Sequence, residues 1–337
     1  MTQVDAPTRL HFGLLHVPDE GTKPDERIRR FGGLGLMLSQ PRVTVQVKKS
    51  HMWSGEGPSA ERALAFARRA VGTSIERFHV RIVACPPEHV GLGVGTQLGL
   101  ATTTAIRAAL GEPKDDAVAL AIRAGRGERS AIGIHGFRSG GLIVDAGKML
   151  GARLGTLAGR CDFPLEWPVV LMRPRLDAAW FGQREKLAFQ RTRVVEWSNI
   201  DRMCRLIWLG IVPAVLDRDY ASFSEHLFEY NRAAGLPFRE DQRGVYAGPE
   251  MERIIELARA VGVQAVGQSS WGPTAFAICE SEEAASRLRE RLRVVEPECE
   301  TTCTTTDNRG AVLLQDAEHR DGEHIRGEHE QRSDHNG

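Results

Sequence analysis

The sequence predicts an α+β fold of two domains with a cleft between them. At 337 residues the chain is long enough to bury a full core, and its length favours two domains. The first half is rich in alternating strands with helices inserted, whereas the second half alternates strands with amphipathic helices. Turn residues and prolines gather at 154–168, which predicts the boundary. We therefore expect domains at 1–160 and 161–314, and a disordered tail at 315–337 that is almost free of apolar residues.

The strands of the first half are recognised by alternation of apolar and polar residues. Val43, Val45 and Val47 alternate with polar residues and give the clearest case. Strands are expected at Thr8–Val17, 29–38, Pro41–Ser50, Phe78–Cys85 and Gly141–Gly147. Helices are expected at Ser59–Val71, with Ser59 as the N-cap, from Thr96 onward, and at Asp115–Gly125.

The second half opens with a buried strand and continues with amphipathic helices. Strands are expected at Trp167–Pro174, within Ala265–Glu280 and within Pro297–Leu314. Helices are expected at Phe181–Arg191, Met203–Leu216, Asp219–Gly235, Pro249–Val263 and Ser281–Arg293.

A glycine-rich loop follows the strand at Phe78–Cys85 and precedes a helix rich in small residues. Gly91, Gly93 and Gly95 stand at every second position. Glycines let backbone amides approach a ligand, and the free amides of a helix N-terminus attract anions. The loop therefore predicts a phosphate or pyrophosphate cradle, with a tight packing turn as the alternative. A Walker loop is excluded because no lysine follows Gly95, and the spacing does not fit the dinucleotide fingerprint.

Composition excludes several classes of protein. Basic and acidic residues balance at 44 each and aromatic residues make up only 6%, so nothing predicts a nucleic-acid surface. The longest apolar run, Leu206–Leu216, is too short to span a membrane and contains Pro213. The N-terminus lacks the apolar run of a secretory signal. Six scattered cysteines without a C-x-x-C pair favour a reducing cytoplasm. We expect a soluble cytoplasmic protein that binds neither nucleic acid nor membrane.

Several motifs in fixed order resemble the GHMP superfamily, which includes galactokinase, homoserine kinase and mevalonate kinase. The glycine loop PPEHVGLGVGTQLGLA (86–101) resembles its phosphate-binding motif, and GQSSWGPTAF (267–276) resembles its C-terminal glycine motif. More narrowly, the chain resembles the family of β-ribofuranosylaminobenzene 5′-phosphate synthases, also called β-ribofuranosylphenol 5′-phosphate synthases. That likeness adds TRLHFGLL (8–15), GFRSGGLIVDAG (136–147) and DNRGA (307–311), and it covers roughly residues 5–315.

This resemblance implies a GHMP-type fold, in which an N-terminal domain like ribosomal protein S5 domain 2 is followed by a ferredoxin-like C-terminal domain. It implies a pentosyltransferase that condenses 5-phosphoribosyl 1-diphosphate with 4-hydroxybenzoate or 4-aminobenzoate. The products are the ribosylated arene 5′-phosphate, carbon dioxide and diphosphate, early in tetrahydromethanopterin biosynthesis. The family also implies Mg²⁺ and a homodimer, and the superfamily implies a loop that in its kinases binds ATP.

The glycine loop supplies the candidate phosphate ligands. Gly91, Gly93, Gly95, Thr96 and Gln97 are expected to hold the diphosphate, and Thr96 also serves as a catalytic and Mg²⁺-binding candidate. GHMP kinases carry a serine where this chain has Val94, so only the Thr96 hydroxyl could replace it. This departure weakens an ATP-kinase interpretation and fits the synthase.

The other candidates come from the remaining motifs. Asp145 is the candidate acid–base or Mg²⁺-binding residue, with a turn-former before Gly147 as the alternative. Candidate substrate contacts are Arg9, His11, Arg138, Gly140, Gly141, Ser269, Ser270 and Thr274. Arginine suits a carboxylate or phosphate, while His11 could equally be a structural histidine and the serines an ordinary connecting loop.

Two other functions stay open at the level of sequence. One is an ATP-dependent small-molecule kinase that uses the same loop. The other is a non-catalytic protein that binds a phosphorylated metabolite. The polar residues at Asp145 and Thr96 favour an enzyme over the non-catalytic protein.

Overall fold

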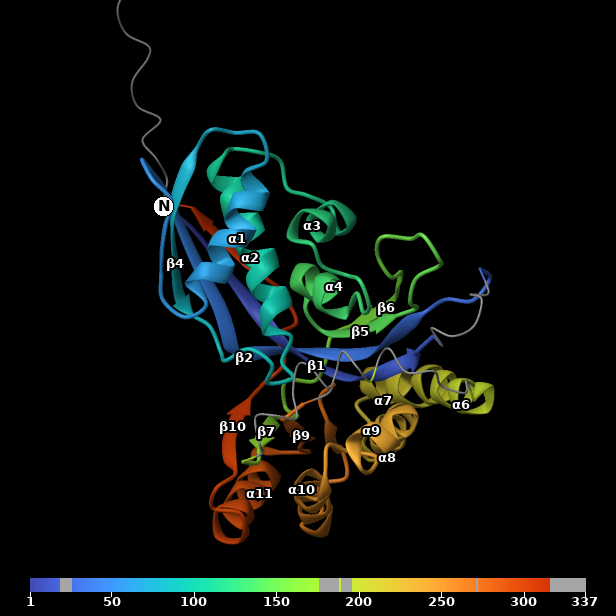
Figure 1. Ribbon diagram of the computed structural model, residues 1–337. Helices are drawn as coiled ribbons and strands as arrows, with labels where there is room; N and C mark the ends of the chain where they lie inside the picture. The colour runs from blue at the N-terminus through green and yellow to red at the C-terminus, as the bar shows by residue number, and fades with distance from the viewer. Residues whose placement is uncertain (19–25, 176–187, 189–195, 271, 316–337) are drawn as a thin grey trace, which may run out of the picture.

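The computed structural model describes residues 1–18, 26–175, 188, 196–270 and 272–315. The predicted helix at Phe181–Arg191 and the predicted tail lie outside these residues, apart from single positions. Two sheets form the framework, and in Figure 1 the helices α1–α4 cover one face of the first sheet while α10 and α11 lie against the second. The chain is therefore a mixed α+β protein, as its sequence predicts.

The first sheet is largely antiparallel and gathers strands from both ends of the chain. Its strands are β1 (Thr2–His16), β2 (Phe31–Ser50), β3 (Ser54–Glu56), β4 (Arg77–Ala84), β5 (Leu142–Asp145), β6 (Leu157–Cys161) and β11 (Val312–Gln315). They run in the order β11-β1-β2-β4-β3, and β5 pairs with both β2 and β6. The helices above it are α1 (Ala60–Val71), α2 (Val94–Ala109), α3 (Ala117–Ala124) and α4 (Ile132–Ser139). The strand β11 joins this sheet although it follows the whole second sheet in sequence.

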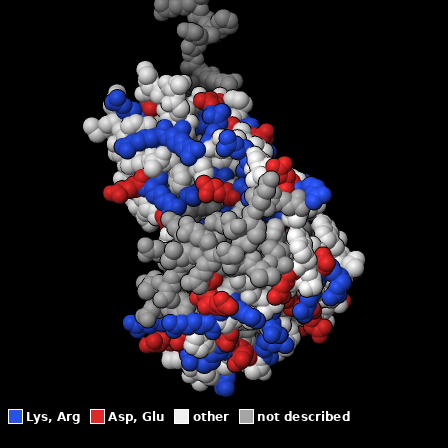
Figure 2. All heavy atoms as spheres, turned by 45° about the vertical axis from the view of Figure 1, so that its right-hand side comes forward, with Lys and Arg blue, Asp and Glu red and all other residues white. Residues whose placement is uncertain are grey.

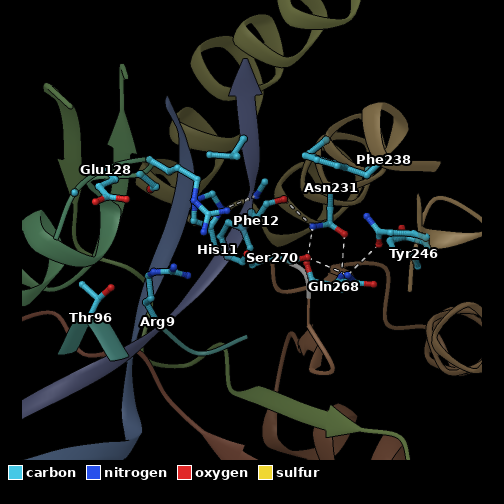
Figure 3. A pocket seen from close by; sticks show the side chains of 18 of the residues that line it. Arg9, His11, Phe12, Thr96, Glu128, Asn231, Phe238, Tyr246, Gln268 and Ser270 are labelled. Carbon is cyan, nitrogen blue, oxygen red and sulfur yellow. Dashed lines mark hydrogen bonds between the residues drawn. The ribbon is translucent and has the colours of Figure 1, made fainter. Parts of the chain in front are cut away.

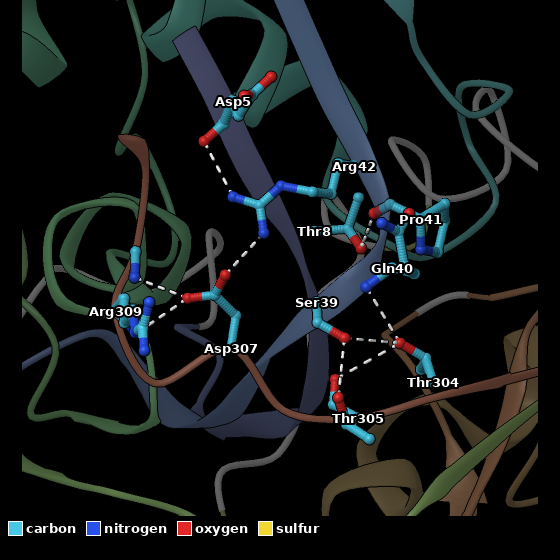
Figure 4. A network of polar contacts seen from close by, with 11 residues as sticks. Asp5, Thr8, Ser39, Gln40, Pro41, Arg42, Thr304, Thr305, Asp307 and Arg309 are labelled. Atoms are coloured by element: carbon cyan, nitrogen blue, oxygen red, sulfur yellow. Dashed lines mark hydrogen bonds and ion pairs between the residues drawn. The ribbon is translucent and has the colours of Figure 1, made fainter. Parts of the chain in front are cut away.

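The strand β2 corrects the prediction of two separate strands at 29–38 and 41–50. Pro41 cannot donate to the ladder, yet the strand continues through it. The partner strand shifts register between Pro7 and Thr8, and the Thr8 hydroxyl donates to the Pro41 carbonyl. Figure 4 shows these side-chain contacts beside the bend. The Thr8 hydroxyl thus satisfies the Pro41 carbonyl where the ladder is irregular.

Two helices in the first lobe also differ from the sequence-based prediction. The helix α2 begins at Val94 rather than Thr96, because Gly93 takes the left-handed conformation just before it. The helix α4 was not predicted from its glycine-rich sequence. Gly136 lets it lie so close to β2 that an added Cβ would stand 2.1 Å from the Met37 sulfur. Close packing, rather than helix propensity, places this helix.

The second sheet is antiparallel, with the order β10-β7-β9-β8. Its strands are β7 (Val169–Arg173), β8 (Val266–Gln268), β9 (Ala275–Ile278) and β10 (Glu300–Thr304). With helices between β7 and β8 and between β9 and β10, the connection order is βαββαβ, the ferredoxin-like arrangement that the resemblance implies. The helices are α6 (Trp197–Leu206), α7 (Val212–Asp217), α8 (Tyr220–Gly235), α9 (Arg239–Gln242), α10 (Pro249–Ala260) and α11 (Glu282–Val295). A π-helical turn, Ile207–Ile211, joins α6 to α7, and a 3₁₀ turn, Leu236–Phe238, joins α8 to α9.

The largest buried cluster runs from the first sheet into the second lobe. Phe12 of β1 and Phe276 of β9 have ring centroids 5.0 Å apart across this junction. A second cluster lies between the second sheet and the helices α10 and α11. Shared apolar packing thus fixes the two lobes against each other, and the groove between them is the place where a site can form.

The surface matches the balanced composition. Figure 2 shows acidic and basic side chains interspersed over the face it presents. Among the described residues, none of the helices has both the length and the apolar character needed to cross a bilayer. All six cysteines are free thiols.

Candidate active site

Two adjoining cavities lie where the first sheet, the helix α2 and the second lobe meet. The larger has a volume of about 260 Å³ and the smaller about 220 Å³. Residues that line both are Arg9, Thr96, Arg126, Arg129 and Ser270. Three of these five are arginines, so the wall that the two cavities share is strongly cationic. Such a wall suits a ligand that carries several negative charges.

The glycine loop forms the smaller cavity. Gly91, Gly93 and Gly95 line it, and Gly93 has φ +68° at the N-terminus of α2. The amides of Thr96 and Gln97 both donate to the Gly93 carbonyl, at 3.0 and 3.1 Å. The first two amides of α2, those of Val94 and Gly95, have no backbone acceptor among the described residues. They are available to an anion, which supports the predicted cradle.

Arginine side chains lie close against the backbone of this loop. A Cβ on Gly93 would stand 2.8 Å from the Arg9 side chain, and a Cβ on Gly95 would stand 2.9 Å from Arg62. Each glycine therefore lets an arginine lie against the loop backbone. Val94, in contrast, is buried in the core, and its side chain offers no hydroxyl to a metal or phosphate.

Arg126 is a half-buried cation on the shared wall. The ring of Phe66 lies between two guanidinium groups, with Arg126 at 5.0 Å and Arg62 at 5.9 Å from its centroid. Arg62 forms an ion pair with Glu88, whereas no described carboxylate pairs with Arg126. Burial, and next the charge of Arg62, lower the pKa of Arg126 to about 10. Its charge is under-compensated, which favours an anionic ligand beside it.

The larger cavity changes character away from this wall. Its far end is lined by apolar and amide side chains and by no described Lys or Arg: Phe12, Leu14, Asn231, Ala234, Phe238, Gln242, Val245, Tyr246 and Gln268. Figure 3 shows Glu128, Thr96 and Arg9 on one side of His11, and Asn231, Phe238 and Tyr246 on the other.

Asn231 holds this neutral end together. Its amide nitrogen donates to Phe12 O at 2.7 Å and to Gln268 O at 3.0 Å, while its oxygen accepts from Gln268 N at 2.9 Å. One side chain of α8 thus fixes β1 against β8.

His11 lies between the two ends and is 3% exposed. A register shift between His11 and Gly13 lets the Gly13 amide donate to His11 Nδ1 at 3.2 Å. Burial lowers the pKa of His11 well below its usual value, and the neighbouring Arg9 and Arg129 lower it further. His11 is therefore neutral at physiological pH.

The structure brings seven of the predicted site residues to the cavity walls: Arg9, His11, Gly91, Gly93, Gly95, Thr96 and Ser270. Three others lie behind the walls and hold the loops. Ser269 donates to Gly91 O at 2.8 Å, and Thr274 donates to Val90 O at 2.6 Å. Gln97 donates to Gly133 O at 2.9 Å. The Ser269 and Thr274 hydroxyls thus join the two glycine motifs, and the Gln97 amide ties α2 to α4.

Four predicted residues do not line either cavity: Arg138, Gly140, Gly141 and Asp145. Asp145 is fully buried, and its carboxylate accepts from Ala131 N at 2.6 Å and Gly147 N at 2.8 Å. Burial raises the pKa of Asp145, although the two amide bonds oppose this shift. The hydrogen bond from Gly147 N corresponds to the alternative given for Asp145, a residue that forms the turn before Gly147. Arg138 donates to Asp115 O on an exposed surface.

Gly140 and Gly141 instead contact the turn 307–310. Gly141 N donates to Asp307 O at 2.7 Å, and a Cβ on Gly140 would stand 2.4 Å from the same oxygen. Asp307 also accepts from Arg42 at 2.7 Å and from the amides of Arg309 and Gly310 (Figure 4). The two sequence motifs GFRSGGLIVDAG and DNRGA therefore meet each other, and their contact fastens the end of the second lobe to β2.

Sequence reasoning did not single out Arg126, Glu128 and Arg129. Their signal is a short basic turn bounded by Gly125 and Ser130, which lies outside all of the motifs described above. The amide residues of the neutral end gave no signal, because Asn231, Gln242 and Gln268 lie on separate elements and share no motif.

Comparison with known proteins agrees with this geometry. Residues 211–295 match the family described as GHMP kinases C terminal. Among solved structures, homoserine kinase from Cytophaga hutchinsonii aligns with a TM-score of 0.66 and 14% identity, covering 93% of this chain and 97% of its own. Mevalonate kinase from Methanococcus jannaschii aligns at 0.60 and 11% identity, covering 91% and 98%. These likenesses establish the GHMP fold.

Two sequence relatives are named beta-ribofuranosylphenol 5′-phosphate synthase. The protein of Archaeoglobus fulgidus is 30% identical over 93% of this chain and 99% of its own length. The protein of Methanothermobacter thermautotrophicus is 29% identical over 92% and 98%. Identity at this level along nearly the whole of each chain confirms what the motifs imply. The chain belongs to the family of β-ribofuranosylphenol 5′-phosphate synthases.

Proposed function

We propose that this protein is a pentosyltransferase that joins 5-phosphoribosyl 1-diphosphate to 4-hydroxybenzoate or 4-aminobenzoate, with loss of carbon dioxide and diphosphate. Family membership supports the reaction and its place early in tetrahydromethanopterin biosynthesis. The observation in the structure that carries it is the shared arginine wall between a glycine cradle and a neutral, partly aromatic cavity. The phosphoribosyl donor is a polyanion and suits the cationic cradle. The benzoate carries an aromatic ring and suits the neutral end of the larger cavity.

The diphosphate fits the smaller cavity. The free amides at the start of α2 and the guanidinium groups of Arg9 and Arg126 would stabilise the negative charge that grows on the leaving group. As the bond between C1 of the ribose and the diphosphate oxygen breaks, that oxygen takes the electron pair. The cradle therefore promotes departure of a leaving group and needs no acid to protonate it.

The arene fits the larger cavity. The ring carbon that bears the carboxylate uses a ring π pair to form the new bond to C1. The bond from that carbon to the carboxylate then breaks, carbon dioxide leaves, and the electron pair restores the aromatic ring. No net proton is gained or lost in this sequence, so the site requires no dedicated base. Asp145 accordingly need not act as one, which agrees with its place behind the wall.

Mg²⁺ is proposed as the cofactor, and the donors present fit it in part. Mg²⁺ binds one or two protein oxygens together with substrate phosphates and keeps several waters. Thr96 and Glu128 line the larger cavity and can supply those oxygens. Asp145 fits poorly, because both of its oxygens already accept backbone amides. When bound, the ion would neutralise charge on the diphosphate.

The test supplies 5-phosphoribosyl 1-diphosphate, Mg²⁺ and carboxyl-labelled 4-hydroxybenzoate, and measures released carbon dioxide. Release that depends on the phosphoribosyl donor supports the synthase. ATP consumption with an added alcohol, without carbon dioxide release, would establish a kinase instead. Binding of the phosphoribosyl donor without turnover would establish a non-catalytic protein. Repeating the assay with 4-aminobenzoate separates the two arenes.

We also propose a cytoplasmic homodimer. The free state of all six cysteines supports a reducing compartment. Leu157 of the edge strand β6 and Trp208, Leu209 and Leu216 are each at least 41% exposed, and Trp208 lies beside Gly159 of the same strand, which supports association. Light scattering on the wild type and on Leu209→Ser checks this: the wild type is expected as a dimer and the variant as a monomer.

A further inference from the structure

The proposed chemistry leaves the imidazole of His11 unused. His11 Nε2 is closed to solvent, and none of the residues that the structure describes forms a hydrogen bond with it. A buried donor without a partner costs folding free energy, and a site retains one only where something else compensates. His11 lines the larger cavity, so a bound substrate can provide that partner.

The local backbone fixes which ring nitrogen carries the proton. Because the Gly13 amide donates to Nδ1, the neutral ring must hold its proton on Nε2. The ring can therefore donate from Nε2, and it cannot accept a proton there. This geometry excludes His11 as the base toward a phenol and leaves it as a neutral hydrogen-bond donor.

The surroundings identify the group that receives this hydrogen bond. Arg9 and Arg129 lie close enough to influence the ring electrostatically, so the potential at His11 favours an anion. His11 lines the larger cavity and not the glycine cradle. On the arene, the only anionic group is the carboxylate. The ring beyond it would then extend toward the neutral end, where Phe238 and Tyr246 lie (Figure 3).

We propose that His11, through its Nε2–H, orients the benzoate carboxylate toward the ribose; this rests on the synthase function proposed above. A neutral donor suits this task better than an arginine. A carboxylate held in an ion pair loses that pair when it departs as uncharged carbon dioxide, which raises the barrier. The neutral His11 holds the same group with a single hydrogen bond, and the arginines remain for the phosphates. His11 is thus a positioning residue that also selects for a carboxylate.

The test compares His11→Gln, His11→Leu and the wild type, with His51→Gln as a control on an exposed turn. Glutamine can place an N–H near the position of Nε2, whereas leucine cannot. We expect His11→Leu to raise the KM for 4-hydroxybenzoate about 10- to 100-fold, the range for losing a hydrogen bond to a charged group, with the donor KM little changed. His11→Gln should retain most of the affinity, and His51→Gln all of it.

A second measurement removes dependence on turnover. Calorimetric titration with 4-hydroxybenzoate and with 4-hydroxybenzamide, in the presence of diphosphate, reports binding alone. The wild type should prefer the carboxylate, and His11→Leu should lose that preference while circular dichroism confirms its fold. If wild type releases no carbon dioxide, the synthase function fails. If wild type is active but His11→Leu changes only the KM of the phosphoribosyl donor, or neither KM, the assignment of His11 is wrong.

Discussion

At the scale of single residues, Arg126 combines a role in the site with a cost to the fold. Its guanidinium packs against the Phe66 ring, and its pKa is lowered because partial burial disfavours the charged form. Arg126→Gln should raise the KM for 5-phosphoribosyl 1-diphosphate about 10- to 100-fold, because a charge-assisted contact to phosphate is lost. The same change should raise the melting temperature of the unliganded protein, since a poorly compensated charge is removed.

The control is Arg123→Gln. Arg123 lies on the exposed side of α3 and pairs with Asp115 at 3.3 Å, away from both cavities. The Arg123→Gln variant should keep the wild-type kcat and the wild-type KM for 5-phosphoribosyl 1-diphosphate. Steady-state kinetics and differential scanning fluorimetry measure the two effects. An unchanged donor KM in Arg126→Gln would remove this residue from the diphosphate site.

His11 makes a separate prediction about stability and pH. Its pKa in the folded protein lies well below 6.5, so the unfolded chain binds a proton over a range where the folded protein does not. Stability therefore rises with pH across this range and is lost as pH falls below 6.5, by up to about 1.4 kcal/mol per pH unit.

Urea unfolding of wild type and His11→Gln measures this contribution. Other titrating groups contribute nearly equally to both proteins, so the difference between the two curves isolates His11. We expect the wild type to lose more stability than the variant between about pH 7 and about pH 5.5. Parallel curves would show that His11 is accessible to protons in the folded protein.

At the scale of elements, the glycine loop and α2 form one unit. Gly93 needs a left-handed backbone and also leaves room for the Arg9 side chain. Gly93→Ala should therefore lower stability, raise the KM of the phosphoribosyl donor and lower turnover. Gly111→Ala separates these effects, because Gly111 has φ +73° with open space around it. We expect this control to lose about 1 kcal/mol of stability from its left-handed backbone and to keep wild-type kinetics. If Gly93→Ala and Gly111→Ala had the same donor KM and the same turnover, the assignment of the glycine loop as the diphosphate site would be wrong.

Sequence patterns predicted elements better than they predicted contacts. Alternation located β4, a continuous apolar run located β7, and apolar periodicity located α8, α10 and α11, because each pattern reflects which side chains are buried. The helix α4 was missed, since its glycines serve contact with β2 and lower its apparent helix propensity. The glycine cradle was recognisable because it is continuous in sequence. Arg126 and Asn231 were not, because their importance depends on what other elements place beside them.

The same distinction explains the motifs that do not line the cavities. GFRSGGLIVDAG and DNRGA are as distinctive in sequence as the glycine loop, yet they form a structural junction around Asp307. A motif marks a position where few residue types fit. It does not tell whether a ligand or another part of the same chain imposes that restriction.

At the scale of the whole molecule, substrate binding should stabilise both lobes together. Arg9 and Thr96 belong to the first lobe, whereas Ser270 and Asn231 belong to the second, and all line the larger cavity. Adding 5-phosphoribosyl 1-diphosphate with Mg²⁺ at about 100 times its Kd should stabilise the protein by about 2.7 kcal/mol in one cooperative transition.

Scanning calorimetry with and without this ligand tests the prediction, with ATP and Mg²⁺ at the same concentration as the comparison. The phosphoribosyl donor should give the larger shift. An equal or larger shift with ATP would favour a kinase. Two separate transitions, of which the ligand moves only one, would contradict a site shared between lobes.

The strand β11 has a consequence for how the protein is made. It pairs with Thr2–Asp5 of β1, so the outer edge of the first sheet is completed by residues 312–315. During synthesis the N-terminal lobe emerges from the ribosome long before the strand that covers it. Until then β1 offers open backbone hydrogen bonds to any neighbouring chain. A fragment that ends at residue 160 would keep this edge open permanently. We therefore expect the newly made first lobe to be most prone to aggregation in the interval before its last strand arrives.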